Sequence, residues 1–476
     1  MLPELFVKRM RELLADGAES VLEALEQEPV VSVRLNPAKC NGFPNVNRQS
    51  PDGKSLDVVP WASDGYYLDE RKAFTFDPLF HAGCYYVQEA SSMFLERVVR
   101  QYVTEPVTVL DLCAAPGGKS THLRSVLPEG SLMVSNEVIP SRAQVLVENM
   151  VKWGHPDCVV TNSTPADFGD LPSFFDVMVA DVPCSGEGMF RKDPVAVAEW
   201  SEANVETCWR RSRGIIADCW DALKEGGLLV YSTCTFNTKE DEENVRWICE
   251  ELGAEVLPLT VSAEWGITGN LLASSQPFPV YRFLPGRTRG EGFFLAVMRK
   301  LSVRETVFHR KQKAVSLRRS LPIPTECKGW IRDASSYECQ LVNDALFAVS
   351  QRHSAALATL QQLVRVLHAG IQLATRQSPN RRSENVVPTP SLALSTALRQ
   401  EAFPRVDVSY ADALAYLRKE ALTLPPNVPR GYILLTFRGV PLGFAKNVGN
   451  RANNLYPSEW RIRTTHLPDN EVWVFY

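Results

Sequence analysis

The chain has 476 residues, of which 45% are hydrophobic, so it is long enough to bury several cores and too long for one ordinary domain. Its formal net charge of -4 argues mildly against a nucleic-acid partner, because phosphate binding normally relies on a surplus of Lys and Arg.

Residues 1–104 are expected to form a small N-terminal α/β domain. Its first segment, Phe6–Leu25, has the apolar spacing of an amphipathic helix, and Val30–Leu35 follows as a short strand. The N-terminus lacks a signal-peptide core, and no apolar run approaches the ~20 residues that a membrane helix needs. We therefore expect a cytoplasmic protein with no membrane partner.

Between residues 105 and 300, short apolar strands alternate with amphipathic helices. The expected strands are Val107–Leu112, Ser131–Asn136, Cys158–Asn162, Asp176–Ala180 and Leu228–Tyr231. The expected helices are Lys119–Leu127, Ser141–Trp153 and Val205–Leu223. This alternation predicts an α/β fold with a doubly wound, Rossmann-like parallel sheet.

The C-terminal part divides into a linker and intermediate domain, residues 301–400, and a last domain, residues 401–476. A basic run opens it: Arg299, Lys300, Arg304, Arg310, Lys311, Lys313, Arg318 and Arg319. This run fits a phosphate track and a solvated linker equally well. Ala345–Leu367 is helical in pattern. Tyr432–Phe437 and Val440–Ala445 predict a hairpin and Val472–Tyr476 a last strand, which together fit a small β-barrel.

Two kinds of motif lie where strands of the expected sheet end. The glycine-rich segment Asp111–Ser120 follows the first strand, and it has neither the Walker nor the Gly-x-Gly-x-x-Gly spacing. Cys184, within Asp181–Gly188, and Cys234, within Ser232–Thr235, each follow a later strand. Because parallel strands end at one edge, this arrangement predicts a cofactor cradle beside a thiolate nucleophile. The alternative is that each cysteine only fills space in the core, because a lone buried cysteine is normally inert.

The 11 cysteines are odd in number and include no Cys-x-x-Cys pair, which favours reduced thiols over disulfides or a zinc site. We expect no metal.

These motifs resemble those of the Sun/nucleolar-protein family of S-adenosylmethionine-dependent RNA cytosine-5 methyltransferases. Further segments that match are Ser32–Pro37, Tyr85–Ser92, Arg191–Pro194 and Gly290–Phe294. Gly439–Lys446 and the following Tyr456-Pro457 resemble the PUA-like tail of the bacterial branch that acts on small-subunit ribosomal RNA. The resemblance implies the methyltransferase fold, in which Phe293–Met298 is an antiparallel strand.

The resemblance also implies S-adenosylmethionine as cofactor. The residues of the glycine-rich loop implied to bind it are Cys113, Ala114, Ala115, Pro116, Gly117, Gly118 and Lys119. Glu137, at the end of the second strand, would accept the ribose hydroxyls, and Arg142 lies a turn beyond it. Asn162 stands near the adenine, where many relatives have aspartate. Asp181 would contact the cofactor amine.

Carbon 5 of cytosine is too weak a nucleophile to attack a methyl sulfonium until a thiolate has added at carbon 6. By resemblance Cys234 is that nucleophile, and Cys184 helps remove the carbon 5 proton and release the product. Asp181 would donate a proton to ring nitrogen 3. The target base must be flipped out or already unpaired.

The predicted function is methylation of carbon 5 of a cytosine in ribosomal RNA by a monomeric enzyme, and the expected substrate is the RNA of the small subunit. The alternatives are the same chemistry on transfer RNA and a non-catalytic RNA-binding assembly factor, which would not need both cysteines. We expect residues after about 301 to select the RNA and the catalytic domain alone to hold the cofactor.

Overall fold

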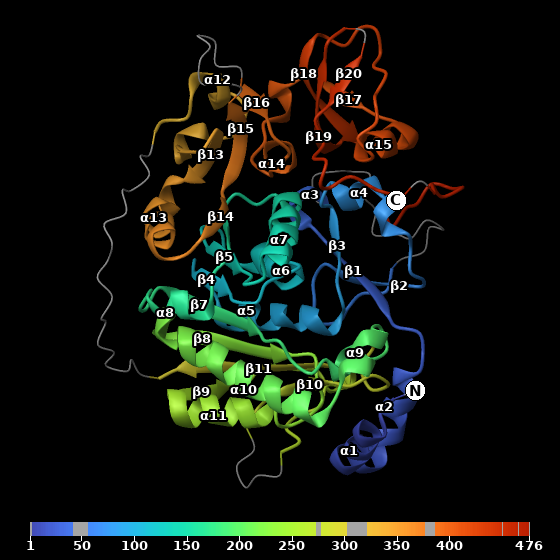
Figure 1. The fold of residues 1–476 in the computed structure, drawn as a ribbon, viewed down its shortest axis with the longest axis vertical. Helices are drawn as coiled ribbons and strands as arrows, with labels where there is room; N and C mark the ends of the chain where they lie inside the picture. Colours follow the sequence, from blue (N-terminus) through green and yellow to red (C-terminus); the bar gives the residue numbers. More distant parts are fainter. Residues whose placement is uncertain are drawn as a thin grey trace.

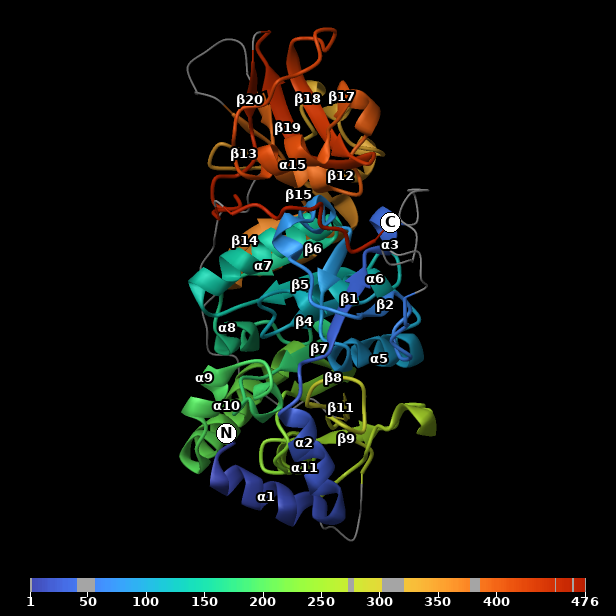
Figure 2. The same ribbon diagram turned by 90° about the vertical axis from the view of Figure 1, so that its right-hand side faces the viewer.

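The computed structural model describes residues 2–40, 56–272, 278–301, 321–376, 386–449, 451–464 and 466–475 (Figure 1). Four sheets lie within these ranges: a small N-terminal one, a large central one and two of four strands in the C-terminal part. The last of these lies at one end of the long axis, and the first two helices lie at the other (Figures 1 and 2).

The N-terminal part consists of helices α1 (Glu4–Leu14) and α2 (Ala18–Leu25) and a sheet of order β2-β1-β3. Its other elements are β1 (Val31–Leu35), α3 (Pro37–Cys40), β2 (Gly65–Leu68), α4 (Pro78–His81), β3 (Tyr85–Val87) and α5 (Leu95–Tyr102). The helical stretch expected over Phe6–Leu25 is broken at Ala15, whose φ is 48°. The break lets α1 turn Phe6 onto Phe190 and Trp200.

The central sheet has the strand order β10-β11-β8-β7-β4-β5-β6-β14, with β9 also paired to β11. The strands from the expected catalytic range are β4 (Thr108–Asp111), β5 (Leu132–Asn136), β6 (Cys158–Thr161), β7 (Phe175–Asp181), β8 (Leu223–Thr233), β9 (Ala254–Leu257), β10 (Tyr281–Phe283) and β11 (Phe293–Lys300). Strands β4 to β8 pair in parallel, and β11 is antiparallel to β8, as expected. The doubly wound sheet is therefore confirmed.

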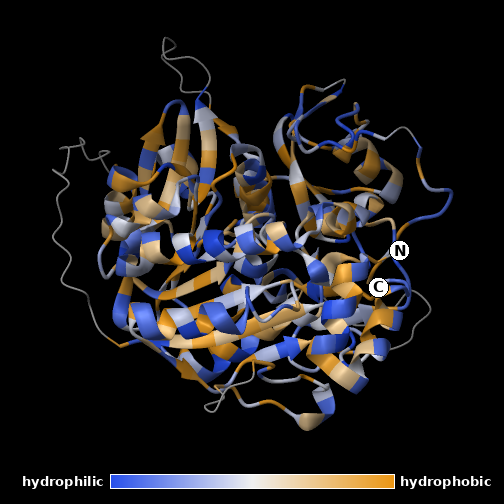
Figure 3. Cartoon of the chain, turned by 60° about the horizontal axis from the view of Figure 1, so that its bottom comes forward, coloured by the Kyte–Doolittle hydropathy of each residue, from blue (hydrophilic) through white to orange (hydrophobic). Residues whose placement is uncertain are grey.

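Each strand of this sheet buries both faces, which explains its nearly continuous apolar sequence. Val109 packs on the face covered by α5, α6 (Gly118–Val126) and α7 (Pro140–Trp153), and Leu110 packs on the opposite face. That opposite face is covered by α8 (Pro165–Gly169), α10 (Glu202–Cys219), α11 (Glu242–Leu252) and α13 (Ser354–Leu363). The short helix α9 (Pro194–Glu199) precedes α10. In Figure 3 hydrophobic colours follow the strands between these helices.

The intermediate part contributes directly to the central sheet. Strand β14 (Val366–Ala369) pairs antiparallel with β6 at its edge, although it lies outside the 105–300 range. The other elements are α12 (Thr325–Lys328), β12 (Tyr337–Val342), β13 (Ala345–Ser350), β15 (Ile371–Arg376), β16 (Val386–Pro388) and α14 (Pro390–Leu394).

A helix predicted over Ala345–Leu367 is wrong over its first six residues and at its end. Ala345–Ser350 is strand β13, because β12 and β15 satisfy its backbone from both sides. Such tertiary pairing outweighs the helical spacing of its Ala and Leu residues. The middle of the range is helical: a 3-10 turn, Gln351–His353, leads directly into α13.

The last part holds β17 (Arg405–Asp407), α15 (Tyr410–Leu417), β18 (Gly431–Phe437), β19 (Val440–Asn447) and β20 (Ala452–Asn454) in the order β17-β18-β19-β20. The predicted hairpin is confirmed as β18 and β19. The strand expected at Val472–Tyr476 is wrong for residues 472–475. Val474 instead donates its N–H to Asp77, and Phe475 packs on Tyr85 of the N-terminal part.

Most of the predicted basic run, from Arg304 to Arg319, lies outside the described residues. Of its two described members, Lys300 is buried and donates to the carbonyls of Trp220 and Leu223. Arg299 pairs with Glu255. These two cations are therefore committed to the protein itself.

Candidate active site

A cavity of about 890 Å³ opens where the carboxyl ends of β4, β7 and β8 meet. The predicted site residues that line it are Cys113, Ala114, Ala115, Pro116, Gly118, Lys119, Asp181 and Cys234. Tyr86 and Gln88 of the N-terminal part and Phe293 of β11 close its walls. The structure therefore brings the glycine-rich loop and the loop that carries Cys234 to one cavity.

The glycine-rich loop turns sharply from β4 into α6. Gly117 has φ +116°, a conformation that favours glycine, and α6 begins at the next residue. At the end of β4, Ser120 donates to one oxygen of buried Asp111, at 2.7 Å. Burial raises the pKa of Asp111 to about 7. The loop is therefore shaped by the backbone and anchored from beneath by a carboxyl group.

The matching segment Ser32–Pro37 holds this loop from the N-terminal side. Arg34 is buried and donates to Thr121 at 2.7 Å, to the carbonyl of Gly118 at 3.3 Å and to Gln88 at 2.7 Å. Its guanidinium also lies over the ring of Trp153 on α7. The N-terminal sheet is thereby fastened to the first turn of α6.

Three predicted cofactor residues lie outside the lining of this cavity: Glu137 and Asn162, which follow β5 and β6, and Arg142, in the first turn of α7. Glu137 is 3% exposed, accepts the N–H of Ile139 and pairs with Arg142 at 3.2 Å. Arg142 also donates to the carbonyl of Ala115, at 2.8 Å. Asn162 donates to the carbonyls of Glu137 and Val138, at 2.7 and 3.0 Å. The amide of Asn162 thus holds the backbone of the neighbouring turn.

Two large apolar side chains beside Glu137 are exposed, Val138 by 51% and Ile139 by 45%. Exposed apolar groups at a strand end are suited to contact a flat ring. The sequence pattern contained this signal, because both follow the acidic residue directly.

The two cysteines lie side by side at the ends of adjacent strands. Their sulfurs are 3.2 Å apart, and the N–H of Cys234 points to the sulfur of Cys184 at 3.3 Å. Hydrogen bonding to Cys234, together with burial, raises the pKa of Cys184 well above that of an ordinary thiol. Cys184 therefore holds its proton at neutral pH while Cys234 is its neighbour.

Asp181 stands between the loop and the cysteines. One of its oxygens accepts from Lys119 at 2.8 Å and the other from Ser232 at 2.7 Å. Burial would lower the pKa of Lys119, but the charge of Asp181 and the hydrogen bond to it raise that pKa overall. The cavity therefore contains a fixed positive charge near Cys234.

Two buried carboxylates cross between the cysteine loops. Glu187, from the Cys184 loop, accepts from Thr235 at 2.7 Å and from the N–H groups of Phe236 and Asn237. Glu240, beyond Cys234, accepts from the N–H of Ser185 at 2.9 Å and from its hydroxyl. Each loop thus supplies the carboxylate that holds the other loop. We call this pair the reciprocal brace.

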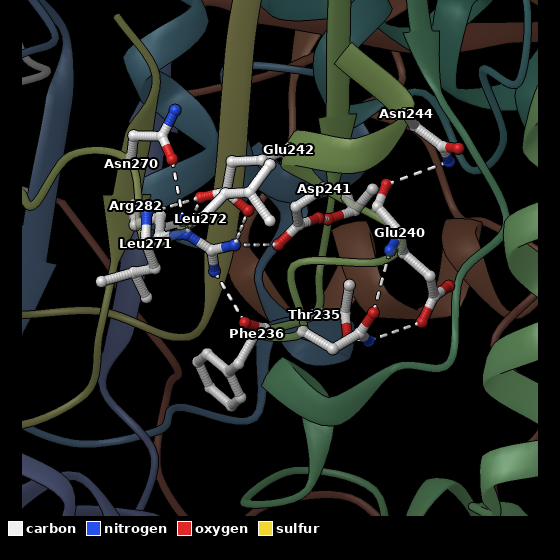
Figure 4. A network of polar contacts seen from close by, with 12 residues as sticks. Thr235, Phe236, Glu240, Asp241, Glu242, Asn244, Asn270, Leu271, Leu272 and Arg282 are labelled. Atoms are coloured by element: carbon white, nitrogen blue, oxygen red, sulfur yellow. Dashed lines mark hydrogen bonds and ion pairs between the residues drawn. The ribbon is translucent and has the colours of Figure 1, made fainter. Parts of the chain in front are cut away.

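A second network supports the Cys234 side of the brace (Figure 4). Buried Arg282 of β10 donates to Glu242 and, at 2.8 Å, to the carbonyl of Phe236, and it lies 3.0 Å from an oxygen of Asp241. Thr233 donates to the other oxygen of Asp241. The loop is therefore tied to β10 as well as to the Cys184 loop.

Neither Glu187 nor the acidic run Lys239–Glu243 was assigned a role from the sequence. The missed signal was the placement of Glu187 inside the motif that carries Cys184 and of Glu240 shortly after the motif that carries Cys234. Within the described residues, no group of three His, Cys, Asp or Glu side chains is arranged to hold a metal ion. No helix in the described ranges is long and apolar enough to cross a membrane.

The doubly wound sheet with an antiparallel β11, the glycine turn after β4 and the acidic residue after β5 define an S-adenosylmethionine-dependent methyltransferase. Residues 102–299 match the family described as 16S rRNA methyltransferase RsmB/F. Residues 2–90 match the N-terminal domain of 16S rRNA methyltransferase RsmF, and residues 403–462 match its PUA domain. A relative from Cronobacter sakazakii, ribosomal RNA small subunit methyltransferase F, is 30% identical over 96% of both chains. The chain belongs to this family of RNA methyltransferases.

Other similar proteins agree with this membership. A protein of the same description from Pectobacterium atrosepticum is 28% identical over 96% of this chain and 95% of its own. The solved structure of a methyltransferase homolog protein from Pyrococcus horikoshii has a TM-score of 0.51 and 27% identity, and the match covers 63% of this chain and 95% of that one. NSun6 from the same organism, solved with SFG, has a TM-score of 0.51 at 19% identity over 63% of this chain and 98% of its own, which shows the fold alone.

Proposed function

We propose that this protein transfers a methyl group from S-adenosylmethionine to carbon 5 of a cytosine in small-subunit ribosomal RNA. The observation that carries the proposal is the pair of sulfurs, 3.2 Å apart, of which Cys234 lines the proposed cofactor cavity. The names of the relatives support ribosomal RNA as the substrate. We also propose that the enzyme acts in the cytoplasm, as a monomer, and that residues 403–462 contact RNA.

The residues present fit this cofactor. The cavity passes Gly118, where an added Cβ would lie 3.4 Å from the ring of Tyr86. We propose that Cys113–Lys119 cradle the amino-acid end, that Glu137 accepts the ribose hydroxyls and that Asp181 accepts from the amine. Arg142 orients Glu137. Bound S-adenosylmethionine supplies an electrophilic methyl group.

Cys234 is the proposed nucleophile. Its sulfur forms a bond to carbon 6, and the electrons of the 5,6 double bond move toward the ring carbonyl and nitrogen 3. The fixed charge of Lys119, paired to Asp181 at 2.8 Å, stabilises the negative charge that develops. From the sequence, Asp181 was expected to donate to nitrogen 3, and Lys119 was ranked low as an assisting group; the ion pair between them favours a larger part for Lys119. Carbon 5 then takes the methyl group.

Cys184 is the proposed base for the carbon 5 proton. Its raised pKa has the hydrogen bond to Cys234 as its largest cause. Once the Cys234 sulfur is bonded to carbon 6, that cause is removed, so Cys184 becomes more acidic. It then releases its proton to water, and the resulting thiolate accepts the carbon 5 proton. When the carbon 5 proton leaves, the bond between Cys234 and carbon 6 breaks and the methylated base is released.

Bisulfite sequencing of ribosomal and transfer RNA, from cells with and without the gene, tests the proposal. We expect one or more cytosines of the small-subunit RNA to lose protection from conversion in the deletion strain. A loss confined to transfer RNA would favour the same chemistry on the other substrate. No change in either RNA would favour a non-catalytic assembly factor.

A further inference from the structure

We propose that Arg365, in the C-terminal part of the chain, is a positioning residue of the cofactor site. It would act by holding the turn after β6, and through it the turn after β5 that carries Glu137. The inference rests on the placement of the cofactor proposed above. It extends the site to a segment 203 residues away from Asn162 in the chain.

Three hydrogen bonds join Arg365 to the turn after β6. The N–H of Asn162 donates to the carbonyl of Arg365 at 2.9 Å, and the N–H of Arg365 donates to the hydroxyl of Ser163 at 2.9 Å. The guanidinium donates to the side-chain oxygen of Asn162 at 3.3 Å. Both the backbone and the amide group of Asn162 are therefore oriented by one residue of another part of the chain.

The amide of Asn162 passes this orientation to the next turn. Its nitrogen donates to the carbonyls of Glu137 and Val138, at 2.7 and 3.0 Å. An amide has one oxygen and one nitrogen, so the contact of the oxygen with Arg365 fixes which way the nitrogen points. Arg365 is thus two contacts away from the backbone of the proposed ribose acceptor.

The sheet topology dictates the position of Arg365. Strand β14 is antiparallel to β6, with Val366 opposite Thr161 and Ala369 opposite Val159. An antiparallel strand begins where its partner ends, so the residue before β14 must lie over the turn after β6. The N–H of Gly370 donates to the carbonyl of Cys158 at 3.0 Å and fixes the far end of the pairing.

Calorimetry of S-adenosylhomocysteine with full-length variants tests the proposal. We expect Arg365→Ala to weaken binding roughly two- to fivefold and Asn162→Ala roughly three- to tenfold, the scale of one or two lost hydrogen bonds. Because Arg365 acts through Asn162, the double variant should bind no more weakly than Asn162→Ala alone. In turnover, Arg365→Ala should raise KM for S-adenosylmethionine and leave kcat at saturating cofactor unchanged.

Thr396→Ala is the matched control. It removes a hydroxyl that donates to the carbonyl of Gly154, which joins the same two parts of the chain away from the turn after β6. We expect its affinity to equal that of the parent protein. Unchanged affinity in Arg365→Ala, additive losses in the double variant, or an equal loss in Thr396→Ala would each overturn the proposal.

Glu137→Ala separates this inference from the proposal on which it rests. If Glu137→Ala weakens binding and Arg365→Ala does not, only the role of Arg365 is rejected. If Glu137→Ala binds as tightly as the parent protein, the placement of the ribose is itself wrong, and the role of Arg365 is rejected together with it. Ser163→Ala, which removes the acceptor of the Arg365 N–H, should weaken binding independently of the guanidinium.

Discussion

Cys184 and Cys234 share two hydrogen bonds, yet their surroundings assign them different tasks. Cys234 lines the cavity and stands near the charge of Lys119. Cys184 is held as a protonated thiol behind it by the raised pKa. Loss of either residue should stop turnover at a different step.

We therefore predict opposite results from the two alanine variants. Cys234→Ala removes the atom that bonds to carbon 6, so no covalent RNA complex can form. Cys184→Ala keeps the nucleophile and loses the proposed base, so enzyme should accumulate on methylated RNA. A denaturing gel with labelled RNA and S-adenosylmethionine should show a shifted band for Cys184→Ala only. A shifted band for Cys234→Ala alone would reverse the two roles.

Glu240 should make the stability of the protein depend on pH. Burial raises its pKa from the ordinary 4.5 to about 7 in the fold. The folded state therefore binds more protons than the unfolded chain between these values, and the contribution of Glu240 to stability decreases as pH rises through this window. The slope is on the order of 1 kcal/mol per pH unit.

Urea unfolding of the parent protein and Glu240→Gln, at pH values from about 5 to 7.5, checks this prediction. The variant should lose part of the dependence on pH, whatever its absolute stability. Glu206, which is half-buried and paired with Lys239, offers Glu206→Gln as the control with little effect on the slope. Equal slopes for the parent and Glu240→Gln would contradict the assignment.

Functional residues that lie within motifs could be identified from the sequence, whereas contacts between residues distant in the chain could not. Lys119 and Asp181 lie 62 residues apart and both belong to matching segments, so both were predicted. Arg365 follows an unremarkable helix, and nothing local marks it. Its contact with Asn162 exists only because β14 joins β6, and that pairing cannot be deduced from spacing.

Among the elements, the reciprocal brace determines how the two cysteine loops face each other. Glu187 receives four hydrogen bonds from the loop after Cys234, all in a buried setting. Gly188 also donates its N–H to the carbonyl of Cys234, at 2.9 Å. The loops should therefore move together.

We predict that Glu187→Gln uncouples the two loops. The loop after Cys234 donates to one oxygen of Glu187, and the indole N–H of Trp200 donates to the other at 3.0 Å. The NH2 group of a glutamine must face donors on one of these two sides, so at least one buried donor loses its acceptor, at a cost of about 2 to 4 kcal/mol in stability. The rate of covalent complex formation should fall by roughly 10- to 100-fold, as expected for a misplaced nucleophile. Cofactor affinity should change little.

Stopped-flow or quench experiments measure the rate of adduct formation. Calorimetry of S-adenosylhomocysteine measures cofactor affinity separately. Glu199→Gln, on the exposed side of α9, serves as a control for the loss of one acid nearby. An unchanged adduct rate in a folded Glu187→Gln protein would show that the brace does not position Cys234.

The same contrast between local and distant information holds for whole elements. Strands β4 to β8 were predictable, because both of their faces are buried and each is therefore an apolar run followed by a turn. The strand Ala345–Ser350 was not predictable, because its small and apolar residues also fit a helix. Only the pairing with β12 and β15 makes this segment a strand. The segment 472–475 has a strand-like sequence but packs as an irregular chain on Asp77 and Tyr85.

At the scale of the whole molecule, the catalytic part cannot be separated cleanly after residue 301. We predict that a chain ending there binds S-adenosylhomocysteine more weakly than the full chain, in contrast to the expectation from sequence that cofactor affinity would be retained. The physical reason is the loss of β14 and of the contacts of Arg365. Calorimetry on both forms, after circular dichroism has shown that the shorter one is folded, measures the difference.

RNA binding by the same two forms should differ in its dependence on salt. If residues 403–462 contact phosphates, the shorter form should lose cations at the interface, and the slope of log affinity against log salt should become shallower. Filter binding between about 50 and 200 mM salt measures both slopes. Equal slopes would place the phosphate contacts entirely within the first 301 residues.

The pairing of β14 with β6 also orders events during biosynthesis. When the ribosome has completed β11, every strand of the central sheet except β14 has been made. Until residue 369 has emerged, β6 is paired with β5 on one side only. Meanwhile the sequence Cys158–Thr161 presents an unpaired apolar edge, the kind that recruits strands from other chains. The nascent chain should therefore need protection from association over this interval, and translational pauses between residues 301 and 369 should lower the yield of folded enzyme.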